Sequence, residues 1–152
     1  HNDRVVEAEP IDQTTLTRRY TAEAVRFVER HRDRPFFVYL PHTFPHIPLA
    51  VGEDQRGRSR AGTYGDAVEE IDDGVGALVA ALQRHRLEHD TLVIVTSDNG
   101  PWYQGSAGGL RGRKNDVFEG GVRVPFVAAW PGRIPADRVI GDVAMGIDVL
   151  PT

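Results

Sequence analysis

The sequence predicts an α/β fold in which a mostly parallel sheet is covered by helices on both faces. Two amphipathic helical segments alternate along the chain with short, almost wholly apolar runs. Such apolar runs are typical of strands that are buried on both faces of a parallel sheet. The chain has 152 residues, 40% of them hydrophobic and 26% charged, which is enough for the core of one ordinary domain.

The first third of the chain is expected to hold two strands that flank a helix. Alternation over Arg4–Glu9 favours a small strand or hairpin arm, which Pro10 ends. Apolar residues recur at helical spacing over Thr14–His31 and predict an amphipathic helix. Phe36–Leu40 is a continuous apolar run and is expected to be a buried strand. It opens into Pro41–Pro48, where three prolines exclude a helix or a central strand and predict a rigid loop.

The middle of the chain predicts a loop, a long helix and another buried strand. Residues 51–62 are polar and glycine-rich, so we expect a mobile loop there. Apolar residues at steps of three and four over Thr63–Arg86 predict a long helix that packs on a sheet. Gly74 and Gly76 each cost such a helix about 1 kcal/mol, which indicates close packing at both glycines. Leu92–Thr96 is the next apolar run and is expected to be a buried strand.

The last third predicts a glycine-rich loop, a strand and the start of a helix. Gly100–Gly112 contains five glycines and is expected to be a loop. The paired glycines Gly120-Gly121 indicate a backbone that needs positive φ or a close approach. Val122–Trp130 is expected to be a third strand, with Pro125 marking an edge or a bulge. Gly146–Leu150 is expected to begin another helix.

Composition excludes several classes of protein. The net charge of −4 disfavours a chain that binds nucleic acid or an anionic membrane as a whole. The longest apolar runs are about six residues, too short to span a membrane. The absence of cysteine excludes disulfides, cysteine-ligated zinc and thiol nucleophiles within this chain. No signal peptide is visible and the chain begins at His1, so we expect a piece of a longer protein.

Asp98 and Asn99 are the first candidate site residues. Leu92–Gly100 is interpreted as a strand whose carboxyl end presents both side chains, and open α/β sheets bind ligands at that edge. Two hard oxygen donors side by side suit Ca²⁺ or Mg²⁺. The alternative is a simple turn, because Asn-Gly is a common hairpin signal. The residues that follow, Pro-Trp-Tyr-Gln, are untypical of a returning strand.

His46 and Lys114 are the other two candidates. His46 lies in the proline-rich loop, where a rigid backbone would fix an imidazole for acid or base chemistry. The alternative is that His42 and His46 merely face solvent. Lys114 is the single lysine beside 17 arginines and follows a basic, glycine-rich stretch that could close on an anion. The alternative is a solvated basic loop; without an aromatic ladder, a nucleic-acid patch is disfavoured.

An ordered set of motifs covers nearly the whole chain. The set comprises Phe36–Leu40, Pro45–Leu49, Tyr64–Asp66, Ile71–Asp72, Val75–Gly76, Thr96–Gly100, Leu110–Lys114, Phe118–Pro125, Trp130–Gly132 and Asp148–Thr152. In order and spacing it resembles the sulfatase family of the alkaline-phosphatase-like superfamily. The resemblance implies an alkaline-phosphatase-like three-layer sandwich with a mostly parallel sheet. Residues 1–152 would form a single partial catalytic domain, without the N-terminal nucleophile-bearing part and the C-terminal subdomain.

The resemblance also implies a role for each candidate. Asp98 and Asn99 would be two ligands of the active-site Ca²⁺, with Mg²⁺ less favoured. Lys114 would contact the sulfate group and the leaving oxygen, and His46 would lie beside the sulfate as a candidate acid for the departing alcohol. These roles are chemically reasonable, because a metal and an ammonium stabilise charge on the bridging oxygen and a proton donor relieves it.

The chain departs from the family pattern near Lys114 and lacks one essential group. Arg113 stands where the family usually has glycine, and Asn115 stands where glycine is usual after the lysine, so both are expected to tighten or reshape the loop. The family nucleophile is a formylglycine made from Cys or Ser in a Cys/Ser-x-Pro-x-Arg motif, which is absent from this chain. The paired aspartates that complete the metal site also have no match here. We therefore expect the nucleophile and the remaining ligands upstream.

The resemblance implies an arylsulfatase-like sulfuric ester hydrolase that cleaves a sulfate monoester at a metal-assisted site. The isolated chain is expected to be inactive. Its partners would be a sulfated small molecule or glycan and the remainder of its own catalytic domain, with no nucleic acid and no membrane span, in a periplasmic or secreted setting. Two alternatives stay open: a phosphonate or phosphodiester hydrolase of the same superfamily, and a non-catalytic pseudoenzyme or binding module. The upstream motif discriminates among the three.

Overall fold

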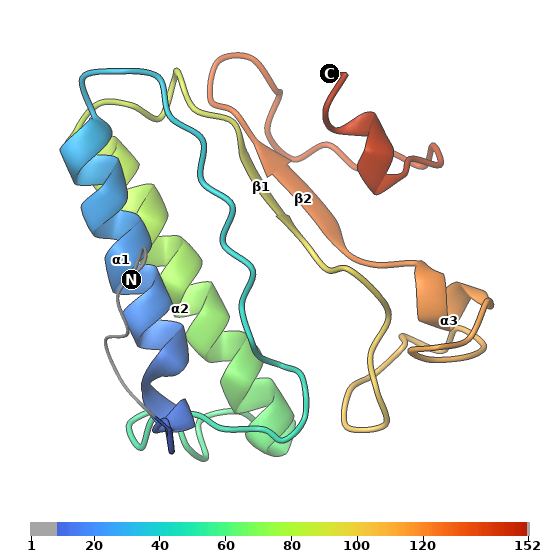
Figure 1. The fold of residues 1–152 in the computed structure, drawn as a ribbon. Coiled ribbons are helices and arrows are strands. Elements are labelled where there is room, and N and C mark those ends of the chain that lie inside the picture. Colours follow the sequence, from blue (N-terminus) through green and yellow to red (C-terminus); the bar gives the residue numbers. More distant parts are fainter. Residues whose placement is uncertain (1–8, 152) are drawn as a thin grey trace.

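The structure, a computed structural model, describes residues 9–151. Figure 1 shows two long helices side by side and a two-stranded sheet next to them. The elements in chain order are a 3₁₀ turn at Gln13–Thr15, α1 at Leu16–His31, α2 at Gly62–Arg84, β1 at Val93–Thr96, α3 at Glu119–Val122, β2 at Phe126–Ala129 and a 3₁₀ turn at Gly146–Asp148. The predicted strand at Arg4–Glu9 lies, except for its last residue, outside the described residues.

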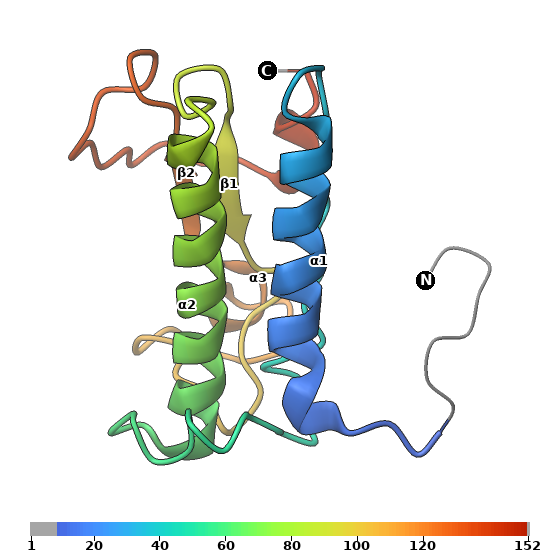
Figure 2. The ribbon, with the colours of Figure 1, turned by 90° about the vertical axis from the view of Figure 1, so that its left-hand side faces the viewer.

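Both long helices were predicted, and they run in the same direction (Figure 2). Ion pairs join them at both ends: Arg18 Nε lies 3.8 Å from Glu70 Oε1, and Arg84 Nη2 lies 3.4 Å from Glu29 Oε1. The side chain of Asp12 accepts a hydrogen bond from the backbone N–H of Thr14 and caps the turn before α1. Parallel helices require a long return between them, and residues 32–61 supply it.

Gly74 and Gly76, both in the middle of α2, behave differently. Gly74 is buried against α1, and a Cβ there would lie 2.6 Å from Thr21 Oγ1. The close packing predicted at Gly74 is therefore confirmed. Gly76 has open space around it, so the same prediction is wrong for Gly76.

The sheet consists of one antiparallel pair. β1 pairs with β2 from Val93 opposite Ala129 to Thr96 opposite Phe126. The mostly parallel sheet of the prediction is thus not formed within residues 9–151. β1 is half-buried at its start and exposed at its end rather than fully buried, because described elements cover little of it.

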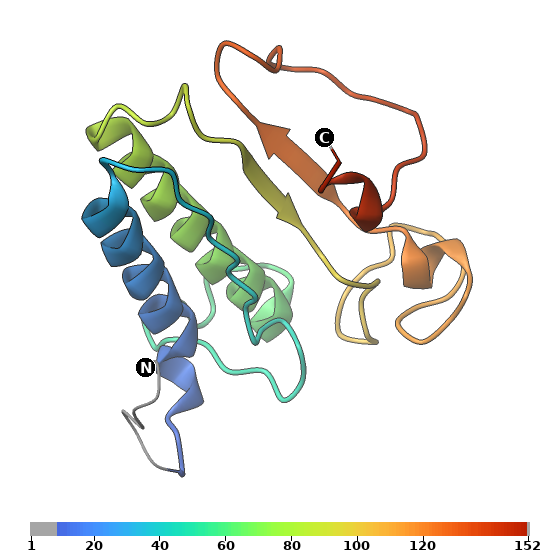
Figure 3. The same ribbon diagram turned by 45° about the horizontal axis from the view of Figure 1, so that its top comes forward.

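Phe36–Leu40 is extended but forms no sheet hydrogen bond with any residue in the described range. It runs in the same direction as β1, as Figures 1 and 3 both show. Phe37 and Tyr39 remain 83% and 78% exposed. The prediction of a buried strand is therefore wrong for this structure: the extended conformation is present, and the neighbours that would pair with it and cover it are not.

The loop that was expected to be mobile is instead fastened to α2. Three acidic side chains on one face of α2 hold it. Asp66 accepts backbone hydrogen bonds from Gly57 (2.9 Å) and Ser59 (2.8 Å). Further contacts join Gly52 to Glu70, and Gln55 and Arg58 to Asp73. A small apolar core of Phe44, Val51 and Ala67, with Leu16 and Ala50 packed against it, includes the first residue of this loop.

The C-terminal third differs from the prediction in two places. The expected strand Val122–Trp130 starts only at Phe126, because Glu119–Val122 forms the short helix α3. The expected helix at Gly146–Leu150 is a single 3₁₀ turn, Gly146–Asp148.

Among the described residues no helix combines the length and the apolar character needed to cross a membrane.

Candidate active site

Asp98, Asn99 and Lys114 lie on neighbouring loops at the carboxyl end of β1. Asp98 is exposed and Asn99 is half-buried, two and three residues beyond the strand. The Thr96 hydroxyl donates to the Pro125 carbonyl at 2.9 Å and closes the end of the strand pair. The backbone N–H of Lys114 donates to the Pro101 carbonyl at 3.0 Å. This bond places the lysine loop against the segment that directly follows Asp98 and Asn99.

Glycines allow these loops to pack backbone against backbone. The N–H of Gly100 donates to the Gly121 carbonyl at 2.8 Å, and the N–H of Gly120 donates to the Arg111 carbonyl at 2.7 Å. A Cβ on Gly120 would lie 2.1 Å from the Gly112 carbonyl oxygen, which no side chain could tolerate. Of the two reasons predicted for the paired glycines, close approach is the one that the structure confirms.

Asn115 explains one departure from the family pattern. Its φ of 76° lies in the left-handed region, which glycine adopts without strain. Asparagine is the residue that tolerates this region best after glycine. The backbone path after Lys114 is therefore one that both glycine and asparagine can follow.

Arg113 makes contacts that sequence reasoning missed. Its Nη1 donates to the carbonyl oxygens of Trp102 (3.1 Å) and Gly105 (2.7 Å). Its guanidinium carbon lies 5.4 Å from the centre of the Tyr103 ring. From the sequence, Arg113 was noted only because it replaces glycine. A charged side chain inside a glycine-rich loop was the one sign that it makes structural contacts.

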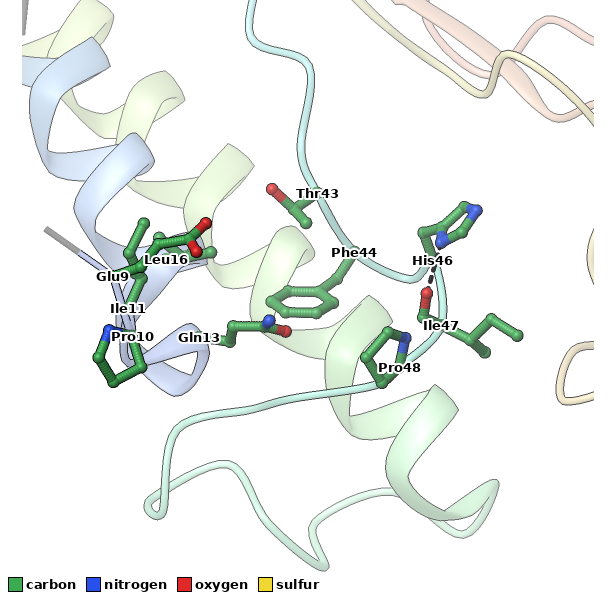
Figure 4. Close-up of a pocket in the computed structure, with 10 residues that line it drawn as sticks. All are labelled: Glu9, Pro10, Ile11, Gln13, Leu16, Thr43, Phe44, His46, Ile47 and Pro48. Carbon is green, nitrogen blue, oxygen red and sulfur yellow. Dashed lines mark hydrogen bonds between the residues drawn. The ribbon is translucent and has the colours of Figure 1, made fainter.

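His46 lies on a different loop, which is anchored by Phe44. Phe44 is only 3% exposed and belongs to the apolar core between the helices and the loop. Phe44 and His46 both line a cavity of about 430 Å³, and Figure 4 shows the exposed imidazole of His46 pointing away from the ring of Phe44. Nδ1 of His46 lies 2.6 Å from the carbonyl oxygen of Ile47. A carbonyl oxygen only accepts, so Nδ1 carries the hydrogen in this contact.

His42 does not share the exposure of His46. It is half-buried, and desolvation lowers the pKa of its imidazole from the ordinary value of 6.5. Its Nδ1 is buried without a hydrogen-bond partner in the part of the chain that the structure describes. The alternative in which both histidines face solvent is therefore wrong for His42. Among residues 9–151, no hydrogen bond or ion pair joins the His46 loop to Lys114.

The oxygen donors present could supply only part of a metal site. Asp98 and Asn99 offer a carboxylate and an amide oxygen, the hard donors that Ca²⁺ and Mg²⁺ prefer. Ca²⁺ takes about six to eight oxygen ligands. Within residues 9–151, no group of three or more His, Cys, Asp or Glu side chains could hold a metal ion. The donor chemistry fits a hard cation, and the donor number requires further ligands from elsewhere.

The described elements match one part of the larger fold of solved sulfatases. The crystal structure of PsFucS1 sulfatase from Pseudoalteromonas sp. superimposes with a TM-score of 0.79 at 34% identity, covering 84% of this chain and 28% of that one. The family profile described as Sulfatase matches residues 2–152. The chain belongs to the sulfatase family.

Curated relatives agree with this membership. The chain is 40% identical to the steryl-sulfatase of Mus musculus over 161 aligned positions, which cover 99% of this chain and 26% of the relative. It is 41% identical to the arylsulfatase A of Bos taurus, with 97% of this chain and 30% of the relative covered. The chain thus spans less than a third of the length of these relatives.

Proposed function

We propose that the complete protein is a sulfatase that hydrolyses a sulfate monoester, and that this chain supplies Asp98, Asn99, Lys114 and His46 to its active site. Membership of the sulfatase family supports the reaction class. The observation that carries the proposal is the 3.0 Å hydrogen bond from the Lys114 N–H to the Pro101 carbonyl. It fixes the backbone of the single lysine beside Pro101, two residues after Asn99.

Lys114 and His46 are proposed to act on the leaving group. When a sulfate monoester is cleaved, negative charge grows on the bridging oxygen. The ammonium of Lys114 would stabilise that charge, and protonation by His46 would then release a neutral alcohol. Because Nδ1 of His46 donates to the Ile47 carbonyl, the proton would be delivered from Nε2 of the charged ring.

Asp98 and Asn99 would hold a cation, for which we propose Ca²⁺ with Mg²⁺ as the less favoured ion. When bound, the ion supplies positive charge that polarises the sulfate oxygens. The remaining ligands and the formylglycine nucleophile are proposed to lie on parts of the protein outside this chain. Residues 9–151 contain no group of three or more His, Cys, Asp or Glu side chains that could hold a metal ion, which supports ligands from other parts of the protein.

We further propose that the rest of the catalytic domain completes a three-layer sandwich with a mostly parallel sheet. Within residues 9–151, Phe36–Leu40 is extended without a paired strand and β1 pairs with β2 alone, so both offer free backbone groups for further strands. Large apolar side chains near the C-terminus also lack cover: Val139 is 98% exposed and Val143 is 97% exposed. Burial of such side chains is a main driving force of folding, so they favour a covering partner.

The substrate is proposed to be a sulfated small molecule or glycan, and the protein to work in the periplasm or outside the cell. The relatives named above are called a steryl-sulfatase and an arylsulfatase. Trp102 and Tyr103 follow the oxygen donors, and their rings meet edge to face at 5.0 Å. Tyr103 is 72% exposed, so it is free to contact an organic group.

Kinetics of the complete protein test the proposal. With an aryl sulfate as substrate, Lys114→Ala is expected to lower kcat by about 10²- to 10³-fold, the usual effect of removing a group that stabilises transition-state charge. Arg133→Gln is the matched control, because Arg133 stacks on Trp130 away from the site loops. Lys114→Ala with wild-type turnover would refute the role of Lys114.

Substrate choice and the upstream sequence separate the alternatives, and chelation tests the metal. Activity on an aryl phosphonate or phosphodiester without activity on the aryl sulfate would favour the other hydrolase of the superfamily. Inactivity on both, with no Cys/Ser-x-Pro-x-Arg motif upstream, would favour the non-catalytic binding module.

Removal of divalent cations by a chelator is expected to abolish sulfatase activity, and Ca²⁺ is expected to restore it better than Mg²⁺.

A further inference from the structure

We propose that Arg113 is a positioning residue that sets the place of Lys114 relative to Asp98 and Asn99. The inference rests on the function proposed for Lys114. It assigns a task to a side chain that stands where the sulfatase pattern usually has glycine. Glycine could make none of the side-chain contacts described below.

Three hydrogen bonds join the lysine loop to the loop that follows the oxygen donors. Two come from the half-buried side chain of Arg113, whose Nη1 donates to the carbonyls of Trp102 (3.1 Å) and Gly105 (2.7 Å). The third runs from the backbone N–H of Lys114 to the Pro101 carbonyl (3.0 Å). Two adjacent residues, Arg113 and Lys114, therefore hydrogen-bond to both ends of residues 101–105.

Both loops are themselves fixed. Residues 101–105 pack on α2, because a Cβ on Gly105 would lie 2.6 Å from Cζ of Tyr64. The backbone of Arg113 is held in a tight turn: its N–H donates to Asp116 Oδ2 (2.9 Å), and its carbonyl accepts from the Asp116 N–H (2.8 Å). Arg113 thus links a loop seated on a long helix to the loop that carries Lys114.

The chemistry of the contact requires arginine. Its guanidinium stays charged, presents several donors in a fixed plane and lies against an aromatic ring, here that of Tyr103 at 5.4 Å. Lysine offers a single charged nitrogen on a flexible stem, so it could donate to the carbonyls without the planar contact. Glutamine could donate to one carbonyl without charge. The series Arg, Lys, Gln, Gly therefore removes the contact in steps.

The test is the kinetics of Arg113→Lys, Arg113→Gln and Arg113→Gly in the complete enzyme, with an aryl sulfate as substrate. Arg113→Gly is expected to lower kcat by about 10- to 100-fold, because a misplacement of roughly 1 Å costs up to about 10²-fold in rate. KM is expected to change less than kcat, since Lys114 itself remains. Arg113→Lys is expected to fall between wild type and Arg113→Gly.

Chemical rescue distinguishes positioning from general damage to the fold. Millimolar guanidinium, at a concentration that leaves the wild type unaffected, is expected to raise the kcat of Arg113→Gly saturably, and equal concentrations of urea or tetramethylammonium are not. Arg133→Gln, which removes a guanidinium from Trp130, is the control for loss of charge and is expected to gain nothing from guanidinium. If Arg113→Gly does not fold, Arg113→Gln is judged by the same criteria.

The possible failures are distinct. Wild-type kcat in the folded Arg113 variant, together with a collapse in Lys114→Ala, would overturn the inference and leave the proposed function standing. A kcat loss that guanidinium does not rescue and that scales with loss of thermal stability would also overturn it. Wild-type activity in Lys114→Ala would instead overturn the proposed function itself.

Discussion

Asn115 controls the direction of the chain directly after Lys114. Its φ of 76° costs a side chain with a Cβ about 1–2 kcal/mol, and a β-branched side chain fits this region worst. We expect Asn115→Gly to leave stability unchanged or slightly raised, and Asn115→Val to lower it by about 1–2 kcal/mol. Urea unfolding of the complete protein measures both changes. Equal stability of the two variants would contradict this account of the backbone.

Asp66 makes the loop on α2 sensitive to acid. Backbone hydrogen bonds from Ser59 and Gly57 hold the pKa of its carboxyl below the ordinary value of 3.8. A lowered pKa means that the charged form stabilises the folded loop above pH 3.8 and that this contribution is lost as the pH falls further. Glu70 has the opposite sign, because burial raises the pKa of its carboxyl.

Hydrogen exchange at the amides of Ser59 and Gly57 checks this pH dependence. Their protection is expected to fall as the pH drops below about 3.8, the ordinary pKa of the carboxyl. Asp66→Asn is expected to weaken protection already at neutral pH and to flatten its dependence on pH. Asp54→Asn is the control, because Asp54 is 61% exposed in its pair with Arg18 and such pairs contribute little. Unchanged protection in Asp66→Asn would refute the role of Asp66.

At the scale of the elements, two glycines of α2 form a matched pair. Replacing glycine by alanine inside a helix gains about 1 kcal/mol where space allows. Gly76→Ala is therefore expected to stabilise the protein, because nothing lies within 4 Å of the new Cβ. Gly74→Ala is expected to destabilise it, because its Cβ would lie 2.6 Å from Thr21 Oγ1.

Thermal unfolding of the two variants measures this difference directly. Adding Thr21→Ala to Gly74→Ala is expected to recover much of the loss, since it removes the clashing hydroxyl. A stabilising Gly74→Ala in the presence of Thr21 would show that the two helices are not in close contact at this point.

Helices and strands differed in how well the sequence predicted them. The helices Thr14–His31 and Thr63–Arg86 were predicted almost to their ends, because an amphipathic period is a local property of the chain. Phe36–Leu40 was predicted as a buried strand from the same kind of local pattern. A strand, however, needs hydrogen-bond partners and covering layers, and these come from residues distant in sequence. Only the extended conformation of Phe36–Leu40 could therefore follow from its own residues.

The candidate site was predictable to a similar degree. Asp98 and Asn99 were expected at the carboxyl end of a strand, and they follow β1 directly. Lys114 was expected in a glycine-rich loop, and the structure places the backbone of that loop against Pro101. His46 was expected on a rigid loop, and its anchor proved to be Phe44, whose burial depends on both helices. The contacts of Arg113 could not be predicted, because its acceptors are backbone carbonyls and any residue carries one. The sequence shows which side chains can donate a hydrogen bond, but only the folded structure shows which backbone carbonyls accept it.

For the whole molecule, exposure predicts how the isolated chain should behave. Phe37, Tyr39, Val139, Val143 and Leu150 are each more than three-quarters exposed. We expect the isolated chain to bind a hydrophobic dye, and to show no turnover of an aryl sulfate because it lacks the proposed nucleophile. Dye fluorescence measures the binding of the dye, and a discontinuous assay at high protein concentration measures the turnover of the aryl sulfate. Multiple turnover by the pure chain would refute our placement of the nucleophile.

The pairing of β1 with β2 has a consequence for how this family could be engineered. Thr96 opposite Phe126 and the Thr96–Pro125 hydrogen bond pin the two ends of residues 97–125 next to each other. The cost of closing a loop then changes only slowly with its length. Residues 97–125 therefore form an exchangeable segment whose two ends are held close together. The corresponding segment of another sulfatase could replace it without disturbing the strands.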